Sequence, residues 1–438
     1  MKLSSYWWDI DEDLTTPMPE QMPHEVDLLV VGAGFTGLSA GLTAARQGRS
    51  VVIIDSGRPG FGASTRNGGI CSGHIRIPHA VLSQRFGKDY ADQVYGEGIE
   101  ARANLVKFCD DEKIDCQITK AGHFNGALSQ KDYDKMGHQC DALNAIPGHD
   151  VELISRDRVH DEIKTDRFYG GLLRREIGGF HPGKFFAGLL RVVAASGAEI
   201  VARTIVEAVE DDNSSDNKDA KLVRTSRGTI RARQVIVATN GYTGTKQPFG
   251  KFLRQRVVPI QSCIIVTEKL GKKRVKDLMP GLRMYGNTAK LSCYFRPVPD
   301  EDRILLGARS FDRLEPSGRS VAFLKNKLVD MLPELAPHNI DYCWLGNVAF
   351  NQRQLPAMFK EDGVYYAAGY AGSGTVWARW LGKKTAELAM GMSNQTSVFY
   401  DKPPAKIPLY DGDPWFMPFV NGYFAVQDQI NEWGYRLK

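Results

Sequence analysis

The chain has 438 residues, 42% of them hydrophobic, which is enough for two domains or for one domain with a large insertion. Its 56 basic and 51 acidic residues nearly cancel, and no dense Lys/Arg run carries interleaved aromatic residues, which argues against a nucleic-acid partner. The seven cysteines are scattered, without a C-x-x-C pair or a zinc-like cluster. We therefore expect reduced thiols, a cytoplasmic protein and no metal site.

The first long apolar stretch, residues 26–45, is about long enough to cross a bilayer and contains only Asp27 as a charge. Glycines divide it into a strand-like half and a helix-like half, and a β-branched run follows Gly48. This pattern favours a βαβ unit over a membrane span. Residues 1–25 are polar, acidic and Pro-rich, unlike a secretory signal, so we expect a soluble chain.

Residues 28–55 predict a strand, a glycine turn, a helix, a second strand and a final acid. This is the dinucleotide-binding fingerprint in its required context. Gly32 permits the tight turn, Gly34 lets the backbone approach a pyrophosphate, and Gly37 lets the helix pack closely on the strand. Asp55 can accept hydrogen bonds from ribose hydroxyls. The residues assigned to binding here are Gly32, Ala33, Gly34, Phe35, Thr36, Gly37, Asp55 and Ser56.

A glycine-rich loop, residues 57–69, follows the acid and favours FAD over NAD. It is too rich in glycine for a helix, and its many backbone N–H groups suit a pyrophosphate and a flavin ring. The alternative is a plain surface turn. The loop residues assigned to the cofactor are Gly62, Ala63, Ser64, Thr65, Arg66, Asn67, Gly68 and Gly69.

Two later strands end in small residues and can return to the nucleotide-binding sheet. The first spans 234–241; the second, 364–368, is followed by a glycine turn and a helical pattern over 376–390. The N-terminus of that helix could stabilise an anionic reduced flavin, although an ordinary β-α connection explains it equally well. No second glycine fingerprint follows, so electrons should come directly from the organic substrate. The residues assigned here are Ala238, Thr239, Asn240, Gly241, Gly372, Ser373, Gly374 and Thr375.

In this order the motifs resemble the D-amino-acid-oxidase-like (DAO) family of FAD-dependent oxidoreductases, and most closely its members that act on polyamine derivatives. Residues 60–69 resemble the family's G-x-G-A-S-x-R-N-G-G loop, and residues 181–184 its H-P-x-K segment. Residues 204–206 resemble the segment whose valine, here Val206, meets the adenine through its backbone.

The resemblance implies an α/β (α+β) fold of two domains: a glutathione-reductase-like FAD-binding Rossmann domain and a substrate domain with an antiparallel sheet. An aromatic C-terminal tail should dock on the substrate domain, although a dimer or membrane-surface contact is an alternative. The expected boundaries are 1–90, 160–245 and 345–395 for the FAD-binding domain, 91–159 and 246–344 for the substrate domain, and 396–438 for the tail.

The resemblance also implies the chemistry, which is oxidation of an amine or amino acid by hydride transfer to flavin N5. The resulting imine would hydrolyse in water, and oxygen would reoxidise the flavin. No cysteine matches the family's covalent flavin link, so we expect non-covalent FAD. Two alternatives stay open, a dehydrogenase that passes electrons to a quinone or carrier protein, and a flavoprotein without redox function. A homodimer is also possible.

Four residues are candidates for substrate contact. Arg296, on an expected strand, could clamp a carboxylate bidentately, or be a surface arginine. Arg353 stands where the family commonly has Asp, and favours a carboxylate substrate if it faces the cavity. Tyr294 and Gln261 alternate onto the possible cavity face. Ser373 stands where many relatives have His, and both departures weigh against a polyamine-derivative substrate.

Overall fold

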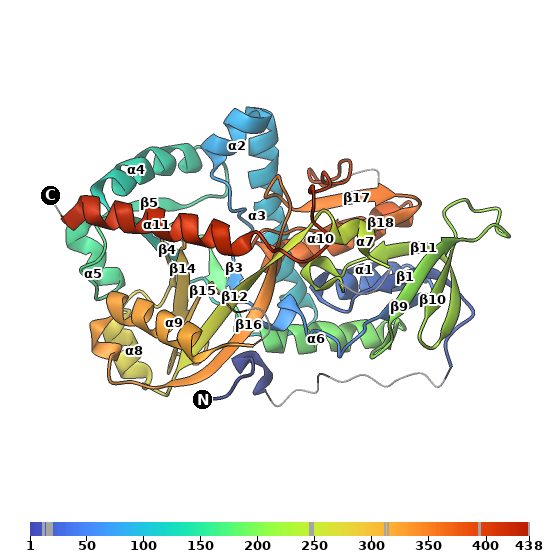
Figure 1. The fold of residues 1–438 in the computed structure, drawn as a ribbon, viewed down its shortest axis with the longest axis horizontal. Helices are drawn as coiled ribbons and strands as arrows, with labels where there is room; N and C mark the ends of the chain where they lie inside the picture. The colour runs from blue at the N-terminus through green and yellow to red at the C-terminus, as the bar shows by residue number, and fades with distance from the viewer. Residues whose placement is uncertain are drawn as a thin grey trace.

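The computed structural model describes residues 1–10, 14, 21–244, 249–310, 312, 315–392 and 396–436. Two large sheets organise this part of the chain, one toward each end of the long axis (Figure 1). Both draw strands from separated stretches of sequence, as the two-domain α/β expectation requires.

The first sheet has the order β17-β18-β11-β1-β2-β8, with β10 and β9 extending from β11. The pairings from β18 to β8 are all parallel, and β17 adds an antiparallel edge. The buried parallel strands read as continuous apolar runs, which is the pattern that both-sided burial demands. The strands are β1 (Glu25–Val31), β2 (Val51–Ile54), β8 (Glu199–Val201), β9 (Val206–Asp211), β10 (Lys221–Thr225), β11 (Gly228–Val237), β17 (Ala357–Glu361) and β18 (Val364–Ala368).

Three helices rich in small or apolar residues pack together beside this sheet: α1 (Phe35–Ala45), α6 (Pro182–Ala195) and α10 (Gly374–Ala389). Glycine lets their backbones touch. A Cβ added to Gly37 would overlap the carbonyl oxygen of Gly32, and one added to Gly382 of α10 would overlap that of Thr36. The Thr36 hydroxyl also lies 2.7 Å from the Tyr370 hydroxyl, which ties the start of α1 to the turn before α10.

The second sheet has the order β16-β12-β15-β14-β13-β4-β6-β5 and is antiparallel except for the β4–β13 pair. One boundary expectation was wrong, because β6 belongs to this sheet rather than to the nucleotide-binding part. Its hydrogen-bonded partners β4 and β5 hold it there. The strands are β4 (His123–Gly126), β5 (Val151–Ser155), β6 (Gly170–Arg174), β12 (Val258–Thr267), β13 (Met284–Asn287), β14 (Cys293–Pro297), β15 (Ile304–Arg309) and β16 (Ile340–Phe350).

The remaining elements connect or cover these sheets. Directly after the glycine-rich loop, β3 (Ile70–Cys71) pairs with β7 (Gly178–Gly179) in a short antiparallel ribbon. The other helices are α2 (His79–Phe86), α3 (Lys88–Asp111), α4 (Gln130–Asn144), α5 (Val159–Glu162), α7 (Lys251–Arg254), α8 (Lys272–Leu278), α9 (Gly318–Met331) and α11 (Met417–Arg436), with short 3-10 turns at Tyr6–Trp8, Ala63–Thr65, Arg156–Arg158, Asn240–Tyr242 and Pro333–Leu335.

Both chain ends pack against the body. The indole of the buried Trp7 donates to the Asn67 carbonyl at 2.7 Å, and that of Trp8 donates to the Thr65 hydroxyl at 2.7 Å, so the N-terminal segment braces the glycine-rich loop. At the other end α11 lies across the second sheet (Figure 1, red). Its Asp428 carboxylate accepts the backbone N–H groups of Lys290 and Leu291 at 2.7 and 2.9 Å. Within the described residues, no helix combines the length and the apolar character needed to span a membrane.

The contact between Gly37 and Gly32 provides a direct test of this packing. Gly37→Ala should destabilise the protein by about 1–3 kcal/mol, because the added methyl group meets backbone that cannot move aside cheaply. The thermal unfolding midpoint measures the effect. Gly96→Ala in α3 is the matched control, since a Cβ there meets nothing within 4 Å. An unchanged midpoint for Gly37→Ala would contradict the close packing of α1.

Candidate functional site

A cavity of about 560 Å³ lies between the carboxyl ends of the parallel strands and the start of α1 and α10. Such a position is where open α/β sheets bind nucleotides. Most residues assigned to the cofactor line it. They are Gly32, Gly34, Phe35, Thr36, Asp55, Ser56, Gly62, Ala63, Ser64, Asn67, Val206, Ala238, Thr239, Asn240, Gly372, Gly374 and Thr375.

Two helix N-termini open into this cavity without side-chain caps. The N-cap residues are Gly34 for α1 and Ser373 for α10, and neither side chain caps a backbone N–H. No acidic residue stands in the first turn of either helix. The backbone N–H of Phe35 donates to the Ser64 hydroxyl at 2.9 Å. The cavity therefore combines two positive helix ends, which suits the pyrophosphate and electron-rich ring of a flavin dinucleotide.

Asp55 ends β2 at the cavity wall. Its Oδ2 accepts the N–H of Ala33 at 2.8 Å and its Oδ1 that of Gly57 at 2.9 Å, so the carboxylate is fixed in place. Burial raises its pKa, against the lowering effect of these two hydrogen bonds. Each oxygen keeps a further lone pair, with which it can accept a ribose hydroxyl.

The space left by glycine also fits FAD. A Cβ on Gly34 would meet only the Ser64 hydroxyl, at 2.9 Å, and one on Gly372 would meet only Val348, at 3.9 Å. Gly372 thus faces space that a side chain would fill, whereas a side chain at Gly34 would also displace the Ser64 hydroxyl. Among the described residues, no cysteine lines the cavity.

Five assigned residues lie behind the cavity wall and support it. Ala33 positions Asp55, and Gly37 makes the backbone contact of α1. The buried Thr65 donates to the Gly60 carbonyl at 2.7 Å. Gly69 and Gly241 are held through their carbonyls, by Arg296 at 2.8 Å and by Asn347 at 2.9 Å.

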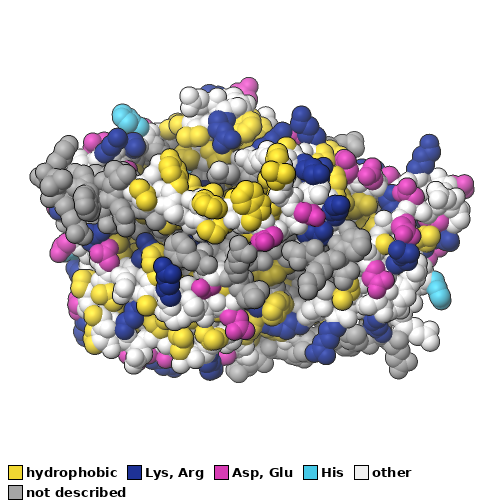
Figure 2. All heavy atoms as spheres, in the orientation of Figure 1, with side chains coloured by type: hydrophobic (Ala, Val, Ile, Leu, Met, Phe, Trp, Pro, Cys, Tyr) yellow, Lys and Arg dark blue, Asp and Glu magenta, His cyan; other side chains and the backbone are white. Residues whose placement is uncertain are grey.

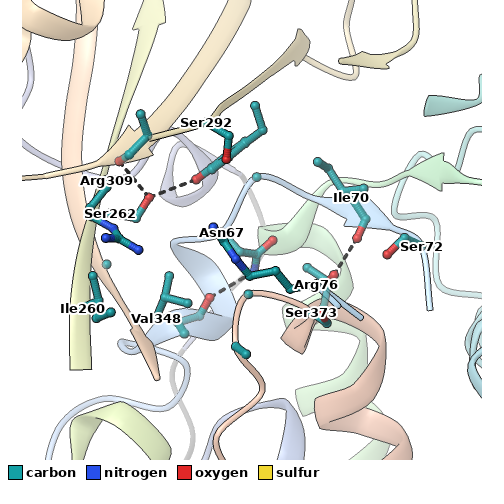
Figure 3. Close-up of a pocket in the computed structure, with 18 of the residues that line it drawn as sticks. Asn67, Ile70, Ser72, Arg76, Ile260, Ser262, Ser292, Arg309, Val348 and Ser373 are labelled. Carbon is teal, nitrogen blue, oxygen red and sulfur yellow. Dashed lines mark hydrogen bonds between the residues drawn. The ribbon is translucent and has the colours of Figure 1, made fainter. Parts of the chain in front are cut away.

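A second cavity, of about 370 Å³, adjoins the first. It reaches into the second sheet, with Ile260, Ser262 and Arg309 on one side and Asn67, Ile70 and Ser373 on the other (Figure 3). Residues common to both walls mark where the cavities meet. They are Ala63, Asn67, Asn347, Val348, Gly372 and Thr375. A cofactor in the first cavity would therefore present one end to a small molecule in the second.

The second cavity is strongly positive. Of the described residues that line it, none is Asp or Glu, while five carry a permanent positive charge. Unpaired cations facing a partly enclosed space favour an anionic ligand. The five are Arg66, Arg76, Arg174, Lys290 and Arg309.

Arg76 and Arg309, the last residue of β15, form one pair of cations in the cavity wall. The Arg309 guanidinium donates to Asn421 Oδ1 of α11 at 3.1 Å and lies 5.6 Å from the Phe424 ring. Burial, and then the charge of Arg76, lower the pKa of Arg309. Burial also lowers the pKa of Arg76. Because the charge of Arg76 acts on Arg309, a carboxylate between the two guanidinium groups would be stabilised by both.

The expectation that Arg296 clamps a substrate carboxylate was wrong, because the side chain does not line the cavity. It is 2% exposed, and its guanidinium donates to the carbonyls of Gly69, Phe180 and Pro297 at 2.8, 3.2 and 2.9 Å. Burial lowers its pKa to about 10. Arg296 thus supports the end of the glycine-rich loop from the side away from the cavity.

Arg353 also lies outside the cavity. Its guanidinium forms an ion pair with the Asp401 carboxylate at 2.6 Å, and 44% of its side chain is exposed. The Arg that replaces the family's usual Asp at position 353 is therefore neutralised by Asp401 at the surface, and it gives no preference for a carboxylate substrate.

The other two candidates do line the second cavity, as do Arg66, Gly68 and Ser373. The Tyr294 hydroxyl lies 3.4 Å from that of Ser262, and burial raises the pKa of Tyr294 to about 12. Gln261 Nε2 donates to Asn347 Oδ1 at 3.4 Å. These two side chains are neutral polar groups at the junction.

Sequence reasoning missed Arg76, Arg174, Arg309, Asn347 and Tyr242. Arg309 follows Gly307 by two residues on β15, and Gly307 pairs with Tyr294, a register that only the structure shows. Strand alternation therefore placed Arg309 on the same face as Tyr294. The other four depend on contacts between distant segments, such as the donation from the Asn347 N–H to the Tyr242 hydroxyl at 3.0 Å.

The cofactor assignment predicts that Asp55→Ala will purify with less than about one tenth of the wild-type FAD, because a buried hydrogen-bond acceptor for the ribose is lost. Absorbance of the released flavin per polypeptide measures the content. Asp111→Ala, at an exposed ion pair with Lys107 in α3, is the matched control. Full FAD content in Asp55→Ala would place the cofactor elsewhere.

Comparison with known proteins agrees with this geometry. The DAO family model, FAD dependent oxidoreductase, matches residues 27–388. Gamma-glutamylputrescine oxidoreductase of Escherichia coli is 28% identical over 92% of this chain and 93% of its own. Two solved structures share the fold. Glycine oxidase from Geobacillus kaustophilus has a TM-score of 0.70 and 20% sequence identity, and the match covers 90% of this chain and 98% of that chain. L-proline dehydrogenase from P. horikoshii has a TM-score of 0.68 and 18% identity, and the match covers 91% of this chain and 99% of that chain. The chain belongs to the DAO family of FAD-dependent oxidoreductases.

Proposed function

We propose that the protein oxidises a carboxylate-bearing amine, such as an amino acid, by hydride transfer to FAD, with oxygen as the final acceptor. One observation carries the proposal: the cavity that adjoins the dinucleotide site is lined by five cations, and by no acid among the described residues. Such a wall repels a free diamine and attracts a carboxylate.

The names of similar proteins support the class of substrate. The E. coli relative is named for an amine, gamma-glutamylputrescine, and the solved structures for the amino acids glycine and L-proline. Because one of these structures is called an oxidase and the other a dehydrogenase, the fold alone leaves the acceptor open.

When bound, FAD supplies the hydride acceptor, and the protein supplies the position and the surroundings. Arg76 and Arg309 would hold the carboxylate and so fix the adjacent C–N bond toward the junction of the cavities. The hydroxyls of Tyr294 and Ser262 lie on the same wall and can accept a hydrogen bond from a neutral amine. Ile260, Val348 and Phe350 line the cavity with apolar surface, which limits the water around the reacting carbon.

Anaerobic mixing of the purified holoprotein with a panel of amines tests the proposal. The panel holds glycine, sarcosine, proline, pipecolate, simple opines and gamma-glutamylputrescine. Every member carries a carboxylate, and we expect at least one of them to bleach the flavin band near about 450 nm. Admission of air should then restore the band with one hydrogen peroxide per substrate. Bleaching without peroxide would favour the dehydrogenase alternative, and an intact band with every amine would contradict the proposal.

Three arginine variants separate binding from support. Arg309→Met should raise the apparent KM for the carboxylate substrate about 10- to 100-fold, because a charge-assisted hydrogen bond is lost. Arg296→Met should lower the unfolding midpoint and FAD content, since three buried carbonyls lose their donor. Arg353→Met, at the surface pair with Asp401, is the control and should leave the KM, the unfolding midpoint and the FAD content unchanged. An unaltered KM in Arg309→Met would remove it from the substrate site.

A further inference from the structure

The second cavity contains another cationic group besides Arg76 and Arg309. It is formed by Arg174 with His123 and His74, all of which line the cavity. Arg174 ends β6, His123 begins β4, and His74 follows β3. His123 and Arg174 are directly opposite in the antiparallel β4–β6 pair, so their side chains share one face of the sheet.

The guanidinium of Arg174 has no carboxylate partner. No described residue forms an ion pair or side-chain hydrogen bond with it, and its Nε is buried without a partner. The nearby acid, Glu176, lies outside the cavity wall, and its Oε1 is 3.0 Å from His74 Nε2. A buried donor without an acceptor is costly unless a ligand supplies one.

The two histidines add donors rather than charge. Burial, and then the charge of Arg174, hold the pKa of His74 well below its usual range and that of His123 at about 3. Both rings are therefore neutral at neutral pH, and each carries one N–H. The Nδ1 of His123 is buried without a partner. The one N–H of neutral His74 is directed to the Glu176 carboxylate, 3.0 Å from its Nε2, so His123 is the ring that can donate to a ligand carboxylate beside the Arg174 guanidinium.

We propose that Arg174, His123 and His74 form a second anion subsite, so that the substrate of this enzyme carries two carboxylates. Arg76 and Arg309 would hold one carboxylate, and the subsite at Arg174 would hold the other. The substrate class is an amino dicarboxylic acid or an N-carboxyalkyl amino acid. This inference rests on the proposed function for the identity of the reacting amine, but the subsite itself is defined by the anion alone.

A metal ion fits the same region less well. His74, His149 and Glu176 offer ligand atoms within 4.8 Å of one another. The charges of Arg174 and Arg102, however, act directly on His74 and would repel a cation. On the face shown in Figure 2, by contrast with the cavity, basic and acidic side chains are interspersed.

Binding of non-reacting acids to the holoprotein tests the subsite without turnover. The probes are the dicarboxylates from malonate to adipate, each compared with the monocarboxylate of the same carbon number, for example glutarate with pentanoate. The change in flavin absorbance, or the heat of binding, gives each Kd. At least one dicarboxylate should bind about tenfold or more tightly than its monocarboxylate, the effect of one added charge-assisted contact. Equal affinities at every length would overturn the inference.

Arg174→Met identifies the residue responsible. It should reduce the preference for the dicarboxylate to about threefold or less, while the monocarboxylate Kd changes little. Arg175→Met is the matched control, because Arg175 follows Arg174 directly and its guanidinium pairs with Glu152 at the surface. A preference retained in Arg174→Met would overturn the assignment. Should that variant fail to hold FAD, the wild-type comparison still decides whether a two-carboxylate ligand is preferred, and His123→Asn repeats the test of the subsite.

The two proposals fail in different ways. Preferential binding of a dicarboxylate, with no amine able to bleach the flavin, would support the subsite and overturn the proposed function. Bleaching by an amino acid, with equal binding of dicarboxylates and monocarboxylates, would support the proposed function and overturn the subsite.

Discussion

The close backbone contacts at Gly37 of α1 and at Gly382 of α10 are the constraint on which the site depends. Gly37 lets α1 rest against the turn at Gly32, and Gly382 lets α10 rest against Thr36. These contacts bring two helix N-termini, neither of them capped by the side chain of its own N-cap residue, to one cavity, where a ligand can accept from first-turn N–H groups. A larger residue at Gly382 would push α10 away from α1, and one at Gly37 would push α1 away from the turn at Gly32. In either case the positive helix ends would no longer meet at the same ligand.

The charge balance of the second cavity's lining differs from that of the whole chain. Positive and negative charges nearly balance over the chain, yet the described lining of this cavity holds cations and no carboxylates. Unpaired cations in a partly enclosed space reduce stability, and burial lowers the pKa of Arg76 and Arg309. An anionic ligand would offset that cost. The arrangement thus exchanges some stability of the free protein for affinity, which is common at functional sites.

The sequence signals for the dinucleotide site are local, and most of the residues assigned from them line one cavity. The strand, turn, helix and acid lie within residues 28–55. The role of each glycine in this motif follows from sterics alone, without knowledge of the fold. The substrate side was predicted poorly. Arg296 and Arg309 both stand on apolar strands, and only the packed structure shows that one faces backbone carbonyls and the other the cavity. His123 and Arg174 lie 51 positions apart and meet only through the β4–β6 register. No spacing rule in a single sequence links such a pair.

The claim that the cavity selects amines by their negative charge is tested most directly by one matched comparison. Anaerobic stopped-flow mixing would measure the rate of flavin reduction by the best amino acid and by its amide, which keeps the amine and the shape but removes one carboxylate. Flavin reduction by the acid should be at least about a hundredfold faster than by the amide at equal low concentration, because the amide loses a charge-assisted contact. Equal rates for the acid and the amide would contradict it, because the cationic wall would then play no part in substrate recognition.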